Sequence, residues 1–254
     1  MAELSAPLLV LLAAFGLAGG IGITAIGPGG VLPTIGLFAL TSLSPAQVAG
    51  TAIVTHVATG ALGTAAYARS GQLRDQQTRR TALILAGAAV IGTPVGVLIN
   101  AAVSKRVFGI LLAVFVTVVA ALVLYRERSR APAPETHPSA PLLAGIGLLV
   151  AVAAGIVGIG GPMLTVPLLV AAGVPVLESL AVAQAQSIVI AGVGSVGYLA
   201  AGAINWPLAA LIGVPELAGV LVGWRIAHAL PTRQLKYALV IALFALAPYL
   251  ALHS

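Results

Sequence analysis

The chain contains no cysteine, and only 7% of its 254 residues are charged. Without cysteine there is no disulfide, no thiolate metal site and no cysteine nucleophile. Because a soluble domain carries roughly 25% charged residues, this scarcity of charge argues against a water-soluble protein. Only 6 residues are Asp or Glu, which argues against a cation site built from carboxylates.

The familiar enzyme motifs are missing as well. The sequence has no HExxH zinc motif, no GxSxG nucleophile turn and no phosphate-binding loop with its lysine. We therefore expect a protein that is not an enzyme and that holds neither a metal nor a cofactor.

What the chain does contain is long apolar sequence, since 60% of its residues are hydrophobic. Runs of about 20 apolar residues can cross a bilayer as helices, and they predict an all-α integral membrane protein with about eight full transmembrane helices. The predicted helices lie at about 6–26, 46–67, 81–99, 106–125, 141–157, 178–200, 207–229 and 235–252.

Two shorter apolar pieces, 31–43 and 162–174, follow clusters of glycine and proline. As helices they would be ~20 Å long, which is shorter than the ~30 Å hydrocarbon core. They are either thin crossings or half-helices that enter the membrane and turn back.

The two glycine clusters belong to an internal repeat. Residues 27–34 and 158–165 are 131 positions apart, and the same offset aligns further residues without gaps. Glycine matches are common by chance, but this register also pairs Thr34 with Thr165, Tyr67 with Tyr198 and Lys105 with Lys236. We interpret the chain as a first repeat (1–125), a polar, proline-rich linker (126–140) and a second, homologous repeat (141–254).

The charged residues of the loops indicate the binding partners of the protein and its membrane topology. The chain has 12 Lys and Arg against 6 Asp and Glu, and its arginines cluster between the apolar runs. This is the pattern of cytoplasmic loops beside anionic lipid rather than of a nucleic-acid surface. Four crossings per repeat would divide the loop Lys and Arg 7 to 4 between the two sides, and five would divide them 9 to 2. The positive-inside rule favours five, and an odd number makes the repeats inverted.

The glycine clusters are the first candidate binding site. Glycine and proline interrupt a helix, and inside a membrane such a break must be buried in protein or line a cavity. A helix that starts there presents free amides to an anion. The alternative is close helix packing, which also uses small residues. The candidate residues are Gly29, Gly30, Thr34, Gly160, Gly161 and Thr165.

Polar side chains in the helix after each break form a second group. The first repeat carries Thr51, Thr55 and His56, and the second carries Gln184, Gln186 and Ser187. These side chains can donate hydrogen bonds to an anion and line a pocket, or they can bond helix to helix. Tyr67 and Tyr198, which lie near helix ends, are predicted to be interfacial anchors.

Ionisable residues inside the apolar runs are few. His56 could relay protons, because imidazole titrates near neutral pH, or it could be a packing residue. Glu216 and Arg225 could take part in charge coupling, Arg225 could hold an anion, or the two could form a structural pair.

These features together resemble the TauE/SafE sulfite-exporter-like (TSUP) family of bacterial membrane permeases. Residues 158–162 followed by Val166 and Pro167 match its glycine-rich turn closely, with Pro162 in place of the last glycine. The first copy, 27–31, is looser, and Gly36 replaces the expected proline. Residues 48–51 match a further pattern of the family, which 181–184 lacks. The resemblance covers essentially the whole chain.

The resemblance implies a transporter of small sulfur-containing anions such as sulfite, thiosulfate or organosulfonates, located in the bacterial inner membrane. Transport would occur by alternating access around a site between the two breaks. The expected partners are a small anion and the lipid bilayer, without nucleic acid, and a homo-oligomer is left open. The alternatives are a non-transporting scaffold, a receptor subunit, or a transporter of another small anion.

Overall fold

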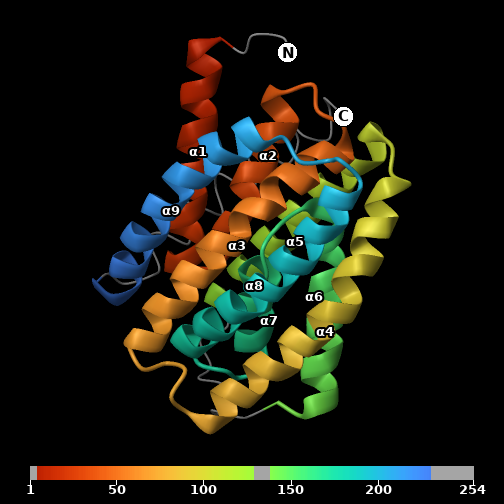
Figure 1. The fold of residues 1–254 in the computed structure, drawn as a ribbon. Helices are drawn as coiled ribbons and strands as arrows, with labels where there is room; N and C mark the ends of the chain where they lie inside the picture. The colour runs from red at the N-terminus through yellow and green to blue at the C-terminus, as the bar shows by residue number, and fades with distance from the viewer. Residues whose placement is uncertain (1–4, 129–137, 230–254) are drawn as a thin grey trace.

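The computed structural model describes residues 5–128 and 138–229, and every regular element in these two ranges is helical. The first repeat contains α1 (Ala6–Ala25), the short 3₁₀ turn η1 (Pro28–Val31), α2 (Leu32–Leu40), α3 (Pro45–Arg69), α4 (Gln76–Ala101) and α5 (Lys105–Arg128). The second contains α6 (Ala140–Val157), α7 (Pro162–Ala171), α8 (Val176–Ala200) and α9 (Trp206–Ala229) (Figure 1).

Glycine conformation ends the first helix of each repeat. Gly27, after α1, has φ +99°, and Gly158, after α6, has φ +76°. Side chains with a Cβ rarely adopt this left-handed region, so a glycine at each position lets the chain leave the helix. The two glycines are 131 residues apart, so the local cause of the break is the same in both repeats.

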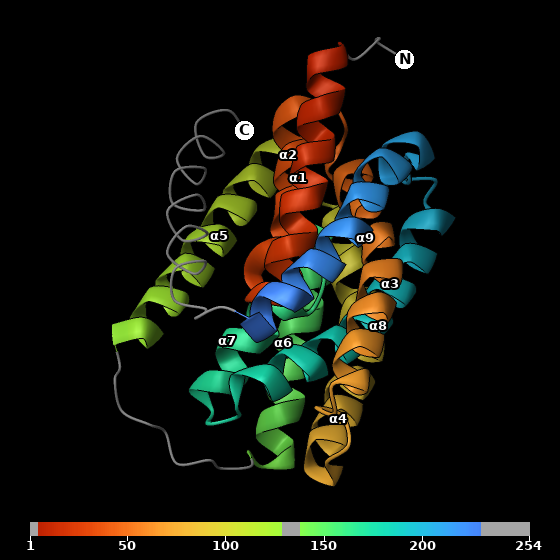
Figure 2. The same ribbon diagram turned by 90° about the vertical axis from the view of Figure 1, so that its left-hand side faces the viewer.

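The chain folds back after the first break. α2 lies beside α1 (Figure 2), and Gly36 packs on Phe15 while Pro33 packs on Gly19. This antiparallel pairing makes α1, η1 and α2 a helical hairpin. The apolar piece predicted at 31–43 thus forms a short helix that runs back along α1.

The capping of α3 follows from its sequence. Ser44 and Gln47 form a reciprocal capping box, and Pro45 occupies the first turn, where its missing amide costs nothing. The bounds of α8 are those of α3 displaced by 131 residues. These two helices pack against each other in opposite directions, since Gly50 contacts Tyr198 and Gly63 contacts Gln184.

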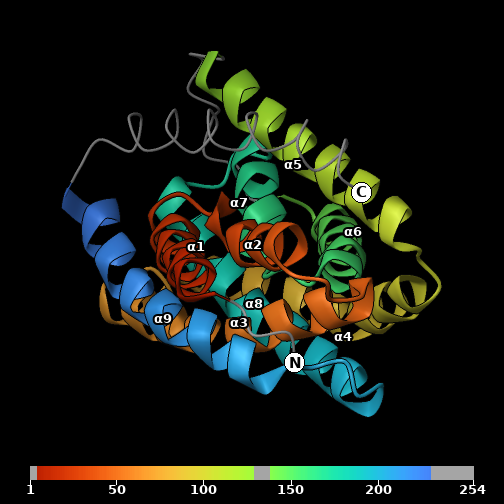
Figure 3. The ribbon, with the colours of Figure 1, turned by 90° about the horizontal axis from the view of Figure 1, so that it is seen from above.

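The first helix of each repeat packs on the fourth helix of the other repeat. A Cβ at Gly16 or Gly20 of α1 would overlap carbonyl groups of α9, at Ile212 and Glu216. Likewise, a Cβ at Gly96 of α4 would overlap the carbonyl of Val152 in α6. Small residues thus bring the backbones together, as is usual in membrane helix pairs. Seen from above, α9 and α5 lie on opposite outer sides, with α1, α2 and α7 between them (Figure 3).

Six of the described helices are long and apolar enough to cross a membrane: α1, α3, α4, α6, α8 and α9. They agree with six of the eight predicted crossings. α5 coincides with the predicted helix 106–125 and continues to Arg128, so the expected linker begins as helix. The remaining predicted helix, 235–252, and linker residues 129–137 lie outside the described residues.

Candidate functional site

The two breaks meet at His56. A Cβ added to Gly30 in the first break would lie 3.5 Å from His56 Cε1, and one added to Gly160 in the second would lie 3.5 Å from His56 Cγ. The imidazole therefore lies between the two breaks. Gly160 also faces Ser187, whose Oγ would be 2.6 Å from the added Cβ. His56 and Ser187 are the residues that the repeat aligns with each other.

Glu216 of α9 completes the buried group. Its Oε2 accepts a hydrogen bond of 2.6 Å from Thr55, and its Oε1 lies 3.2 Å from His56 Nδ1. Both ionic side chains are 0% exposed. We call these residues and their neighbours from α8 the central cluster; its members are Thr55, His56, Gln186, Ser187 and Glu216.

Several polar atoms of the central cluster make no hydrogen bond, although His56 Nδ1 and Glu216 Oε1 face each other as an ion pair. These are both ring nitrogens of His56, Nε2 of Gln186, Oγ of Ser187 and Oε1 of Glu216. Within the described residues, the backbone amides of Gly160 and Gly161, which precede α7, also make no hydrogen bond. A buried polar atom without a partner costs about 1–3 kcal/mol, so this many in one place indicates room for a hydrogen-bonding guest.

Thr165 is joined to the central cluster, and Gly161 lies beside it. The hydroxyl of Thr165 donates to Gln186 Oε1 at 2.6 Å, which leaves the amide nitrogen of Gln186 free. A Cβ at Gly161 would lie 3.2 Å from the same oxygen. The start of α7 therefore faces α8 through groups that can donate to an anion.

Four other predicted site residues have structural partners. Thr34 donates to the Gly158 carbonyl, and Gln184 donates to the Ile23 carbonyl at 3.0 Å. Thr51 accepts the Asn205 amide ahead of α9 at 2.9 Å. A Cβ at Gly29 would overlap the backbone of α1 at Gly22, so Gly29 serves close packing within the hairpin. These residues hold the breaks and helix ends in place.

One of the alternatives for Glu216 and Arg225 is not observed, and one prediction is wrong. Arg225 is exposed on α9, whereas Glu216 is buried with His56 as its ionic partner, so the structural pair of Glu216 with Arg225 is not formed. Tyr67 and Tyr198 are 0% and 1% exposed and are not interfacial anchors. Their hydroxyls donate to the carbonyls of Thr24 and Gly155, at 2.5 and 2.7 Å. These two hydrogen bonds are themselves related by the 131-residue offset.

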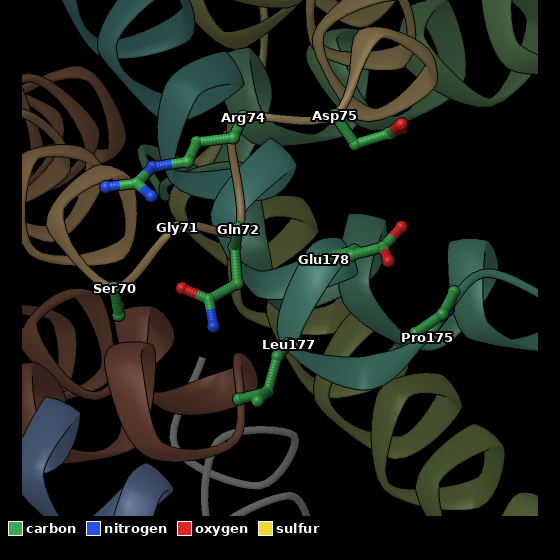
Figure 4. A pocket seen from close by; sticks show the side chains of 8 residues that line it. All are labelled: Ser70, Gly71, Gln72, Arg74, Asp75, Pro175, Leu177 and Glu178. Atoms are coloured by element: carbon green, nitrogen blue, oxygen red, sulfur yellow. The ribbon is translucent and has the colours of Figure 1, made fainter.

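A cavity of about 500 Å³ lies apart from the central cluster, where the α3–α4 loop meets the start of α8. Figure 4 shows the carboxylates of Asp75 and Glu178 on one side of it and the guanidinium of Arg74 pointing to the other. Thr78 donates to both carboxylates, which ties the start of α4 to α8. No predicted site residue lines this cavity.

Apolar helices of membrane-spanning length, surrounding a pair of broken hairpins, define a multi-pass membrane protein. The chain matches the family described as Sulfite exporter TauE/SafE over residues 12–250. It belongs to that family of membrane transport proteins, as its glycine-rich turns indicate. Searches of curated proteins and of solved structures found no match.

Proposed function

We propose that this protein transports a small sulfur-containing anion, such as sulfite, thiosulfate or an organosulfonate, through a site at the central cluster. The observation that carries the proposal is the set of unpartnered donors around Gly160: the Ser187 hydroxyl, the Gln186 amide group and the His56 ring. Oxyanions accept several hydrogen bonds at once, and hydrogen bonds to charged groups are the stronger ones. The free amides ahead of α7 add the favourable end of a helix dipole.

The transport mechanism we propose is alternating access between inverted repeats. The antiparallel packing of α3 on α8, which the repeat aligns, supports inversion. Every side chain of the central cluster is at least nine-tenths buried, which is the state expected between the outward-open and inward-open forms. The short helices α2 and α7, which follow the breaks, can move against the longer helices.

Flux into proteoliposomes tests the function. Purified protein should support saturable uptake of radiolabelled sulfite, thiosulfate or a sulfonate, and unlabelled substrate should compete for it. A scaffold or receptor subunit would give no saturable flux with any of these anions. If only a different small anion gave saturable flux, the protein would be a transporter, but the proposed substrate would be wrong.

The role of the central cluster is tested by a matched pair of substitutions. Ser187→Ala removes a donor that faces Gly160, and it should weaken anion binding about 10-fold, since a hydrogen bond to a charged group contributes about 1.5–3 kcal/mol. Ser195→Ala removes another unpartnered hydroxyl on α8, about 12 Å further along the helix, and should leave binding unchanged. Equal effects of the two substitutions would place the site elsewhere.

A further inference from the structure

The interior around the central cluster has no fixed positive charge. Every Lys and Arg whose burial is described is exposed: Arg69, Arg74, Arg79, Arg80, Lys105, Arg106 and Arg225. The ionisable groups next to the two breaks are therefore His56 and Glu216 alone among the described residues. Tyr67 and Tyr198, the other buried titratable side chains, are engaged with backbone carbonyls.

With one proton between them, His56 and Glu216 have a net charge of zero, whether that proton resides on the imidazole or on the carboxyl group. An anion that enters this buried space therefore adds an uncompensated negative charge. Such a charge is costly in a membrane interior. One additional proton on the pair, giving an imidazolium beside a neutral carboxyl group, would remove that cost.

The geometry provides a place for this proton. Oε2 of Glu216 is engaged by Thr55, whereas Oε1 has no hydrogen-bond partner and faces the imidazole. The opposite ring nitrogen of His56, Nε2, is also free, and the ring lies between Gly30 and Gly160. In the doubly protonated pair the carboxyl proton resides on Oε2 and is donated to the Thr55 hydroxyl, which itself donates to the Ala52 carbonyl at 2.9 Å. Oε1 then accepts the Nδ1–H of the imidazolium, and the Nε2–H is left for an anion.

We propose that the His56–Glu216 pair is the coupling site of this transporter and takes up one proton with each monoanion. This inference rests on the proposed function. The proton comes from water on the side where the anion enters, binds the pair without any other bond changing, and leaves to water on the opposite side. Anion and proton thus move together, and the cycle carries no net charge.

A proton suits this site better than a metal cation does. A hard metal cation requires several oxygen ligands, and Glu216 is the one carboxylate in the central cluster. The hydroxyl of Thr55 already donates to the carboxylate. The 131-residue offset aligns Glu216 with Leu85, which is buried and apolar, and His56 with Ser187. The equivalent positions therefore do not form a second ionisable pair.

Calorimetry of the purified protein tests the proton count. The probes are methanesulfonate and thiosulfate, because neither gains nor loses a proton near neutral pH. Titrations in buffers of different ionisation enthalpy give the protons taken up per anion, and we expect about one for methanesulfonate. In proteoliposomes, a pH gradient should drive methanesulfonate flux, and a potassium diffusion potential set with valinomycin should not.

The double variant His56→Gln/Glu216→Gln keeps similar volume but removes both ionisable groups, so its proton uptake should fall to zero. Glu178→Gln makes the same change at the loop cavity and should retain the wild-type value. Binding by the wild type without proton uptake, or flux that follows the potential, would overturn the coupling proposal alone. If the wild type binds neither of these anions and does not bind sulfite, the proposed function fails, and coupling with it. The wild-type measurements decide the question even if the double variant does not fold.

Discussion

Neighbouring glycines in the two breaks have different roles. Gly29 packs against the backbone of α1, where a Cβ would overlap Gly22, whereas Gly30 and Gly160 face the imidazole of His56. The sequence could predict that both glycine clusters interrupt helices, because the effect of glycine and proline on a helix is local. It could not predict which glycine faces the site, since that depends on the rotation of each turn against helices that are distant in sequence.

Gly160→Ala should weaken anion binding about 10-fold or more, as expected when a charged hydrogen bond is lost. The added Cβ would lie 2.6 Å from Ser187 Oγ and would fill the space between the break and α8. Calorimetry or thermal stabilisation by sulfite measures the effect.

Gly192→Ala is the matched control for Gly160→Ala. No atom lies within 4 Å of a Cβ added at Gly192, and alanine favours the helix, so binding should be unchanged and stability equal or higher. Gly29→Ala is unsuitable as a binding test, because its overlap with α1 would disturb the hairpin itself. A loss of binding in Gly192→Ala but not in Gly160→Ala would contradict the assigned position of the site.

A tyrosine from another helix holds the helix end that precedes each break. Tyr67 of α3 holds the end of α1 through Thr24, and Tyr198 of α8 holds the end of α6 through Gly155. The repeat predicted that the tyrosines are equivalent. Their burial was not predictable from position near a helix end, because it depends on residues distant in sequence: Tyr67, for example, packs with Val166 of α7 and Leu180 of α8.

Tyr67→Phe and Tyr198→Phe should each destabilise the protein by about 1–3 kcal/mol, because each leaves a buried carbonyl without its partner. The two tyrosines lie near the opposite ends of an antiparallel pair, so the effects should add in the double variant. Thermal unfolding in detergent measures both. A double variant no less stable than either single variant would show that the two hydrogen bonds are not independent supports.

The whole molecule has two distinct ends. The α3–α4 loop and the start of α6 lie at one end, and the start of α1 lies at the other (Figures 1 and 2). At the first end, Arg74 lies in the loop, and Arg79 and Arg80 lie at the start of α4. Apolar runs predicted the described membrane-length helices because length and hydropathy are properties of each segment alone. They could not predict the exchange of partners between repeats, which is decided by backbone contacts at scattered glycines.

We expect the arginine-rich end to face the cytoplasm, in line with the positive-inside rule. Because the chain lacks cysteine, single cysteines can report it: Gln76→Cys should be labelled by an impermeant thiol reagent only after cells are opened. Ala201→Cys, exposed in the α8–α9 loop at the other end, should be labelled in intact cells. The reverse labelling pattern would show that the arginine-rich end faces the outside of the cell.

The exchange of partners between repeats also sets an order of assembly during synthesis. α4 and α6 are separated by one described helix, α5, and can pair early, but α1 must wait for α9, which begins at Trp206. At ~5–20 residues per second, synthesis of the intervening chain takes on the order of ten seconds or more. Through that interval the face of α1 with Gly16 and Gly20 is in contact with lipid or the insertion machinery. Glu216 likewise reaches His56 of α3 only after α9, the last helix of the described residues, has been made.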